Sequence, residues 1–456
     1  MRWPARLSPA GLLRRGGAGV LDSGTSSAAT FLTTLYAAHY FTFEQLGAYA
    51  LFFGSFVFCA GLVAAAVYTP AEVEVLRVPP PGRVLSLPSS ARTGTGVALV
   101  LGVVVLALSF LLTRQVPVRL RLEFALPTLL LVVVSPMQDH LRRLLHSSER
   151  SASAVQVSLV QFVAVGVVLL LTVLTPLPHV LGPTVALTAA NVLSLAVGLG
   201  LCRRVLRSLG PSARLVLHAR DLLPAGRWLL LNGLLSFSGP YLVVLVLTQL
   251  LDLGVVGQVE GVRILGQAIL VLGTGLLAVT GPALFAAGRD RDAGAARRLT
   301  RTHVRGVVAL GLVYVLVVGV PWPGSPLRDL FPAAYATPGL LAAQLVTLVL
   351  TAASLPLNSL MIGGGRHREL VLGQAVTTAG TVLASVTVLV LGAFASPFSS
   401  FVTLVLSVAT SLFYLGRMYR SSRSSSDPAD GASADRPDQP VLGARPGTVV
   451  DGAPGA

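Results

Sequence analysis

The chain is dominated by apolar stretches of around 20 residues that recur from one end to the other. This is the length that an α-helix needs to cross a hydrocarbon layer about 30 Å thick. In such a layer every backbone N–H and C=O group must be satisfied within the protein. The stretches are too long and too continuous for the strands of a membrane barrel. The sequence therefore predicts an all-α, polytopic membrane protein.

The composition supports this fold class. Hydrophobic residues make up 53% of the 456 residues, charged residues only 12%, and the mean hydropathy is +0.76. A soluble protein of this length would need more charge to cover its core. The net charge of +15 comes with 34 basic residues, all of them Arg. They lie in short clusters between apolar stretches and form no single patch, which argues against nucleic-acid binding.

Cysteine and histidine give no sign of a metal centre. Cys59 and Cys202 fall in or at the end of expected helices, and their spacing suggests neither a disulfide nor a metal site. The seven His are scattered without the spacing of a ligand set. The first apolar run follows Arg14 and Arg15, is long, and lacks a clear cleavage site, so we expect an uncleaved first helix.

We expect about 12 transmembrane helices. Several exceed the minimum length, so they should tilt or extend past the membrane. The expected spans are 17–41, 45–69, 94–113, 122–140, 152–174, 183–203, 228–250, 254–287, 303–320, 334–360, 369–393 and 397–418.

Arginine positions predict the orientation in the cell (inner, cytoplasmic) membrane. Basic residues concentrate on the cytoplasmic side of membrane proteins. With the N-terminus inside, 29 of the 34 Arg fall on that side and four fall in the outer loops. Omitting one helix would destroy this alternation. The pattern therefore predicts an even number of helices with both termini in the cytoplasm.

An internal repeat appears when the chain is compared with itself. A shift of 216 places Arg150 on Arg366, and a shift of 210 pairs Asp22 with Asn232, Ser26 with Ser236, Leu35 with Leu245 and Gly47 with Gly257. Such spacing predicts two six-helix bundles, residues 1–210 and 211–420, related by an axis along the membrane normal. The segment 421–456 is rich in Ser, Asp, Pro and Gly and is expected to be a disordered cytoplasmic tail.

Glu260 and Arg263 are the most informative charged residues. They lie one turn apart inside an expected helix, where a charge at the bilayer centre costs about 2.5–3.5 kcal/mol on insertion scales. One interpretation places them on a polar cavity, where they bind substrate or an ion. The other is a self-satisfied i,i+3 pair near the outer interface.

Asp22 opens the membrane part of the first helix. It is a candidate proton or cation site, a candidate partner for Arg263, or an interface residue near Arg14 and Arg15. Asn232, its repeat mate, is either a hydrogen-bond donor in helix packing or a cavity-lining residue.

Asp139, Arg142 and Arg143 close the fourth expected helix at its cytoplasmic end. They form a candidate cytoplasmic mouth, acting as a gate or an anchor for anionic headgroups. The alternative is ordinary anchoring of a helix end on the inner side.

Three segments resemble the multidrug/oligosaccharidyl-lipid/polysaccharide (MOP) exporter superfamily, especially its Wzx-type polysaccharide flippases. They are VLDSGTSSAATFLTTLYAAHYFTFEQLGAYALFF (20–53), QDHLRRLLHSSERSASAVQVSLVQF (138–162) and LLDLGVVGQVEGVRILGQAILVLGTGLLAVTGPALFA (250–286). The resemblance implies a MATE/MOP-like fold with a central cavity lined by Asp22, Glu260 and Arg263. It also implies two halves that rock about hinges near Gly47 and Gly257.

The function expected from this resemblance is transport, with no enzymatic activity. We expect a flippase or exporter of a lipid-linked oligosaccharide for cell-surface polysaccharide synthesis, in contact with membrane lipids and partnered by a glycosyltransferase or polymerase. It needs no cofactor, and proton or sodium coupling through Asp22 or Glu260 is a hypothesis. The alternatives are a cation-coupled multidrug antiporter, a polytopic glycosyltransferase, and a non-transporting scaffold of a glycan-assembly complex.

Overall fold

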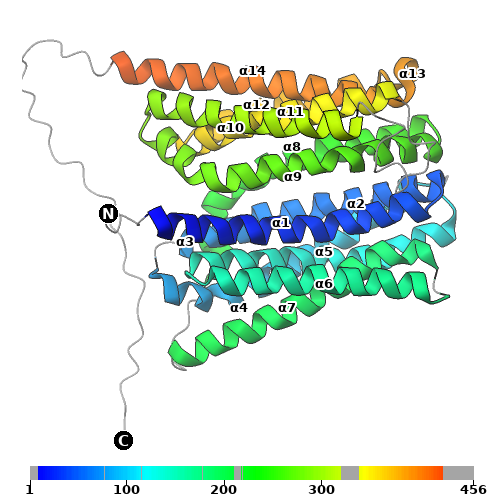
Figure 1. The fold of residues 1–456 in the computed structure, drawn as a ribbon, viewed down its shortest axis with the longest axis horizontal. Coiled ribbons are helices and arrows are strands. Elements are labelled where there is room, and N and C mark those ends of the chain that lie inside the picture. The colour runs from blue at the N-terminus through cyan, green and yellow to red at the C-terminus, as the bar shows by residue number, and fades with distance from the viewer. Residues whose placement is uncertain are drawn as a thin grey trace, which may run out of the picture.

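A computed structural model describes residues 9–424, apart from 76–77, 115, 177, 210–216, 218 and 320–337. Throughout these ranges the regular structure is helical, and no strand occurs in them. The prediction of an all-α fold is therefore confirmed. Long helices lie roughly parallel in two groups: α1 to α7 form the first lobe, and α8 to α14 form the second (Figure 1).

The first lobe alternates long helices with short turns. Its helices are α1 (Pro9–Tyr40), α2 (Phe43–Val63), α3 (Thr69–Val75), α4 (Leu87–Leu112), α5 (Val118–Ser147), α6 (Ser151–Leu174) and α7 (Gly182–Leu209). A π-helical turn, η1 (Ala64–Tyr68), joins α2 directly to α3, and short 3-10 turns, η2 (Pro80–Ser86) and η3 (His179–Leu181), precede α4 and α7.

The second lobe has a similar order. Its helices are α8 (Ala219–Leu250), α9 (Leu253–Arg289), α10 (Ala293–Tyr314), α11 (Pro338–Gly363), α12 (His367–Ser385), α13 (Val388–Leu391) and α14 (Ala395–Ser424). A π-helical turn, η4 (Val315–Gly319), continues α10, and a 3-10 turn, η7 (Gly392–Phe394), links α13 to α14.

We call the end of the molecule where α1 begins the near end, and the end where α1 meets α2 the far end.

Ten helical segments of the described chain are long and apolar enough to cross a membrane. Their outward faces carry many exposed apolar side chains, among them Leu126 and Leu174. The chain is therefore a multi-pass membrane protein. The other two long helices, α1 and α12, do not meet the same length and hydropathy criteria, so a total of 12 spans stays a prediction that requires both of them to cross as well.

Several expected helix ends differ from the structure. The span 369–393 is wrong at its end, because α12 stops at Ser385 and the chain turns before the short α13. Gly392 has a positive φ of 53°, which ends α13 and starts a new turn. Average hydropathy cannot detect such a break, because the residues on both sides are apolar. At the C-terminal end, α14 continues to Ser424. The rest of the expected tail and residues 320–337, between the expected spans 303–320 and 334–360, lie outside the described residues.

The two lobes repeat the same turn after their fourth long helix. Glu149 has φ 62° and Gly365 has φ 70°, and these positions are 216 residues apart. The N–H of Arg150 donates to the carbonyl of Leu145 at 2.9 Å, and that of Arg366 donates to Met361 at 3.0 Å. This 6→1 hydrogen bond after a left-handed residue defines a Schellman turn. The structure thus gives the spacing of 216 a physical basis.

The spacing of 210 appears at the far end, where each lobe begins its second long helix. Thr42 caps α2 by accepting from the N–H of Gln45, and Asp252 caps α9 by accepting from the N–H of Val255. A side-chain oxygen at this position satisfies a backbone N–H that has no partner in the helix. Equivalent caps therefore start equivalent helices in both lobes.

Candidate functional site

The lobes meet at the far end through direct backbone contact between α2 and α9. A Cβ atom added to Gly47 would lie less than 3.0 Å from the carbonyl oxygen of Leu253, and one added to Gly257 would lie as close to the carbonyl oxygen of Phe43. The two contacts are related by the shift of 210. Only glycine allows backbones to approach so closely. The expected hinge glycines are thus a symmetric crossing point; their action as hinges stays a prediction.

A second seam joins α2 to α8. The ring of Phe237 fills the space that a side chain at Gly61 would need, and the methyl of Ala65 does the same at Gly233. Closer to the far end, Tyr241 of α8 reaches into the first lobe, where its ring stacks on Phe58. This aromatic contact and the two glycine contacts make α2 and α8 a closely packed pair.

The hydroxyl of Tyr241 also makes polar contacts across the seam. It shares a hydrogen bond of 2.6 Å with Ser109 of α4 and accepts one of 3.3 Å from Ser55 of α2. The two serine hydroxyls are fully buried and are 3.1 Å apart. Sequence inspection did not single out this cluster, because isolated hydroxyls on different helices carry no pattern.

Replacing Tyr241 by phenylalanine should weaken the contact between the lobes by about 1 kcal/mol. The variant keeps the ring but removes the hydrogen bonds to the two serines, and a neutral hydrogen bond contributes about 0.5–1.5 kcal/mol net. The thermal unfolding midpoint of detergent-purified protein measures the effect. Tyr40→Phe is the matched control, because Tyr40 is an exposed ring at the far end. An equal shift in both variants would contradict the assigned role of Tyr241.

Asp22 lies inside the first lobe at the centre of a buried ion pair. Arg142 of α5 donates from Nε to Oδ1 at 3.1 Å and from Nη2 to Oδ2 at 2.8 Å, which is a bidentate pair. His146 lies 3.0 Å from Oδ2, and the hydroxyl of Ser158 on α6 donates to Oδ1. Both Asp22 and Arg142 are buried, and three helices therefore converge on one carboxylate.

Amides and hydroxyls extend this ion pair across the lobe. Arg142 donates to Ser26 at 2.8 Å, and Ser26 donates to the side-chain carbonyl of Gln161 at 3.3 Å. That carbonyl also accepts from Gln138, and the amide nitrogen of Gln161 donates to Asn191 on α7 at 2.6 Å. A buried polar chain thus runs from α1 and α5 through α6 to α7. In a low-dielectric interior such hydrogen bonds strengthen one another.

The residues of the expected cytoplasmic mouth lie in different surroundings. Arg142 is buried and paired with Asp22 in this conformation, and its role at a mouth stays a prediction. Asp139 is half-exposed and accepts from Arg142 at 3.0 Å, while Arg143 is exposed and lies 3.4 Å from Glu72. The reason for the difference is helix geometry: neighbouring residues on α5 point about 100° apart, so Arg142 and Arg143 face different surroundings.

Glu260 and Arg263 lie on α9, three and six residues past the Gly257 crossing. Arg263 donates from Nε and Nη2 to the two carboxylate oxygens of Glu260 at 2.7 Å and 2.6 Å. Glu260 is buried near the buried Tyr49 of α2, whereas the Arg263 side chain is 36% exposed. The geometry is that of an i,i+3 pair at the seam between the lobes. The structure pairs Asp22 with Arg142, so the alternative of an Asp22–Arg263 pair is wrong for this conformation.

Asn232 lies on α8 next to Gly233, which packs against Ala65 of the first lobe. Its side-chain oxygen is enclosed and has no hydrogen-bond partner among the described residues. A buried acceptor without a partner costs about 1–3 kcal/mol. The residue therefore differs from its repeat mate Asp22, whose carboxylate oxygens both accept hydrogen bonds. Its role as a hydrogen-bond donor or a cavity-lining residue stays a prediction.

Four further residues of the polar site were not identified from the sequence: Glu72, His140, His146 and Ser158. Glu72 on α3 accepts from His140 at 3.0 Å, and His140 also contacts the hydroxyl of Ser90 and stacks on Tyr68. One signal could have revealed His146, which follows Arg142 by four residues and therefore shares its face of α5. Glu72 and Ser158 are on other helices, so sequence spacing could not predict their contacts.

Comparison with known proteins gives similarity at the level of structure. No protein-family model matches the chain, and no curated protein matches its sequence. An outward-facing structure of a multidrug-resistance MATE family transporter of the MOP superfamily aligns over 92% of this chain and 98% of its own, with a TM-score of 0.65 and 16% identity. An inward-facing structure of a transporter so described gives 0.63, 14% identity, and coverage of 87% and 96%.

The chain therefore has the fold of MATE transporters. The lipid II flippase MurJ in an inward closed conformation also aligns, with a TM-score of 0.62, 12% identity, and coverage of 91% of this chain and 93% of MurJ. Identities this low establish shared architecture alone. Within this MATE fold the paired charges of the site occupy two places: the interior of the first lobe at Asp22 and Arg142, and the seam between lobes at Glu260 and Arg263.

Proposed function

We propose that this protein is a Wzx-like flippase that moves a lipid-linked oligosaccharide across the cytoplasmic membrane by alternating access. The observation that carries the proposal is the symmetric Gly47–Gly257 crossing, where two lobes touch backbone to backbone. A crossing point of this kind, at one end of the seam, gives rigid lobes a place about which they change their relative angle while each lobe keeps its packing. The similar fold of a lipid II flippase supports the same reading.

The chemistry of the cargo explains why a polar seam is needed. Each sugar hydroxyl that enters hydrocarbon without a hydrogen-bond partner costs about 1–3 kcal/mol or more. A polar path between the lobes removes this cost for the glycan, while the lipid chain stays in the bilayer. The proposal places the near end in the cytoplasm, as the arginine distribution predicts, and includes a glycosyltransferase or polymerase as partner.

Arg263 is the residue that we assign to the anionic phosphate of the cargo. Its Nε and Nη2 bind Glu260, and its Nη1 makes no hydrogen bond within the described part of the chain. A guanidinium has five N–H donors and can bind a carboxylate on one edge and a phosphate on another. Glu260 then holds the guanidinium in place and keeps the empty site close to neutral.

Replacing Arg263 by alanine should reduce flipping at least about tenfold, because one charge-assisted contact to phosphate contributes about 1.5–3 kcal/mol. The substitution also leaves the buried Glu260 without its partner and destabilises the protein, so flipping is compared at equal protein yield. Two quantities measure the effect: the amount of polysaccharide exported to the cell surface, and the amount of lipid-linked precursor that accumulates on the cytoplasmic side.

Arg289→Ala is the matched control for this experiment. Arg289 forms an ion pair with the adjacent Asp290 beyond the predicted span, and it holds the pKa of that carboxyl below its usual value. Its loss should leave export unchanged. Normal export in Arg263→Ala would remove Arg263 from the mechanism, and an equal loss in both variants would indicate a general effect of arginine content.

The runner-up is a cation-coupled multidrug antiporter, which the similarity to MATE transporters favours. In the first lobe the Asp22 carboxylate is already occupied by the guanidinium of Arg142. A transported cation would have to displace a bidentate pair, which argues for the flippase. Efflux of fluorescent dyes that depends on sodium or protons, and that is lost in Asp22→Asn, would favour the antiporter instead.

A further inference from the structure

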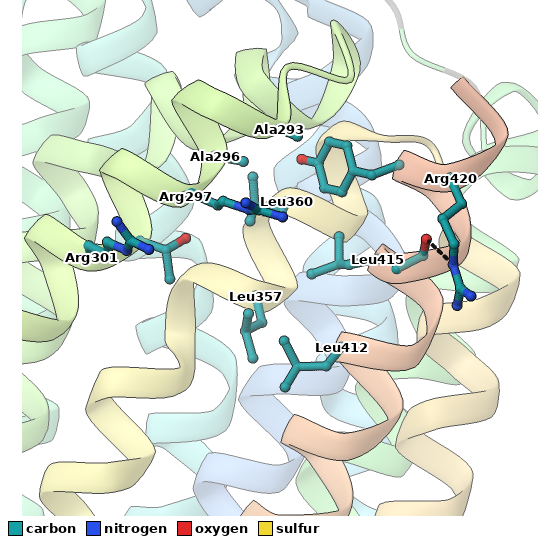
Figure 2. Close-up of a pocket in the computed structure, with 12 residues that line it drawn as sticks. Ala293, Ala296, Arg297, Arg301, Leu357, Leu360, Leu412, Leu415 and Arg420 are labelled. Carbon is teal, nitrogen blue, oxygen red and sulfur yellow. Dashed lines mark hydrogen bonds between the residues drawn. The ribbon is translucent and has the colours of Figure 1, made fainter. Parts of the chain in front are cut away.

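A cavity of about 560 Å³ opens at the near end of the second lobe, away from the seam between the lobes. Its walls come from the first two turns of α10 and the last turns of α11 and α14 (Figure 2). Leucines form its lower part, among them Leu357 on α11 and Leu412 on α14. Such a size is typical of sites that hold a small organic molecule or part of a lipid.

The rim of this cavity is strongly basic. Arg297 and Arg301 come from α10, and Arg420 comes from α14, while no acidic residue is among those that line it. Arg420 uses its Nε to donate to the carbonyl of Gly416 at 3.2 Å. As far as the described residues show, none of the three forms an ion pair. Three positive charges around one cavity favour an anionic ligand.

A second cavity, of about 530 Å³, lies farther along α11 and α14 towards the far end. Its lining is almost entirely apolar and includes Val346 on α11 and Phe401 on α14. Between the two cavities the same helices present exposed apolar side chains, Leu350 on α11 and Val405 on α14. On each helix, this residue lies seven residues from the leucine of the first cavity and four residues from the named residue of the second cavity. These spacings of two turns and one turn place the three side chains on one face of the helix.

We call the two cavities and the apolar face between them the groove. The length of its apolar part matches the hydrocarbon thickness of one lipid leaflet. Leu412 in the basic cavity and Phe401 in the apolar cavity are eleven residues apart on α14, which corresponds to about 16 Å of helix. Half of a hydrocarbon core of about 30 Å is about 15 Å. The basic end of the groove matches the headgroup of an amphiphile, and its apolar length matches the chain. The amphiphile would lie perpendicular to the membrane plane in the leaflet at the near end.

We propose that this groove is a binding site for an anionic membrane phospholipid. Its phosphate lies at the basic rim against Arg297, between Arg301 on one side of the cavity and Arg420 on the other (Figure 2), and one acyl chain follows α11 and α14 from Leu412 towards Phe401. The lipid comes from the surrounding leaflet, because the groove is formed by helices outside the seam and its apolar part is continuous with the exposed face of the lobe. This site is separate from the proposed cargo site at Arg263.

The test uses the full-length protein in phosphatidylcholine nanodiscs or micelles, titrated with phosphatidylglycerol and observed by native mass spectrometry. We expect one phosphatidylglycerol to bind in preference to phosphatidylcholine. The triple variant Arg297→Gln, Arg301→Gln and Arg420→Gln should bind roughly a hundredfold more weakly, because each basic residue near an anionic headgroup contributes about a factor of five.

A matched triple variant controls for total charge. Arg203, Arg204 and Arg207 are exposed at the near end of α7, and their exchange for Gln should leave phosphatidylglycerol binding unchanged. Equal loss in the two triple variants would overturn the site, because any basic surface would then suffice. Unchanged binding in the first triple variant would also overturn it.

Two further measurements distinguish a lipid site from a simple anion site. Val346→Trp fills the apolar cavity and should weaken long-chain phosphatidylglycerol while leaving a short-chain analogue unaffected. Glycerol phosphate without acyl chains should not compete at concentrations near that of the lipid. Full competition by glycerol phosphate, or no effect of Val346→Trp, would overturn the assignment to a phospholipid.

Discussion

Replacing Arg142 by methionine should destabilise the protein by about 3–5 kcal/mol. The substitution removes the guanidinium that makes a bidentate contact with Asp22 and leaves that carboxylate buried inside the first lobe. Breaking one side of a buried ion pair costs this much because the remaining charge loses its partner but not its desolvation penalty. His146 and Ser158 still contact Asp22, so they limit the loss. Thermal unfolding of the purified protein measures it.

Two other variants make this prediction specific. Asp22→Asn combined with Arg142→Met removes both charges and should recover most of the lost stability, since two neutral groups need no compensation. Arg143→Met is the neighbouring control, because Arg143 is exposed and its pair with Glu72 spans 3.4 Å. Surface pairs contribute about 0–1 kcal/mol. A double variant as unstable as Arg142→Met alone would refute the ion pair as the cause.

Much of the fold could be predicted from the sequence, because hydropathy reports the environment of whole helices. Apolar stretches of sufficient length predicted the long helices, and the equivalence of Gly47 and Gly257 was visible as a shift of 210. Helix ends were less predictable. Arg227 and Trp228 mark the beginning of the apolar part of α8, yet the helix already starts at Ala219, since a helix continues into water without any change in hydropathy.

The partners of the charged residues were less predictable than the residues themselves. Glu260 and Arg263 are three residues apart on one helix, so their pairing was available from the sequence as one of two alternatives. Asp22 and Arg142 are 120 residues apart, and only the packing of α1 and α5 against α6 decides that they meet. The same applies to the groove for an anionic lipid, whose arginines on α10 and α14 are brought together by the fold.

Replacing Gly257 by alanine should shift the protein towards conformations in which the lobes are apart at the far end. The new methyl group would lie less than 3.0 Å from the backbone carbonyl of Phe43, and a helix backbone cannot turn aside as a flexible side chain can. Overpacking of this kind costs about 1–3 kcal/mol. Because the cost falls on the state in which α2 and α9 touch, that state should become roughly 5- to 150-fold less populated.

The distance between the lobes at the far end measures this shift. Spin labels at Arg119→Cys, on the exposed start of α5, and at Val390→Cys, on the exposed α13, report it in a background without Cys59 and Cys202. The distance distribution should move to longer values in Gly257→Ala, and the proposed flipping should slow because the far end no longer closes fully.

Gly275→Ala is the control within the same helix, since a Cβ atom there meets nothing within 4 Å. Both substitutions raise the helix propensity of α9 equally, so a difference between them isolates the contact with Phe43. Gly47→Ala should reproduce the effect, because the repeat places Gly47 against Leu253 in the same way. If Gly275→Ala widened the distance equally, or Gly257→Ala left it unchanged, the crossing point would have no role in the relative motion of the lobes. Agreement between Gly47→Ala and Gly257→Ala would instead show that the two halves of one contact limit the same motion.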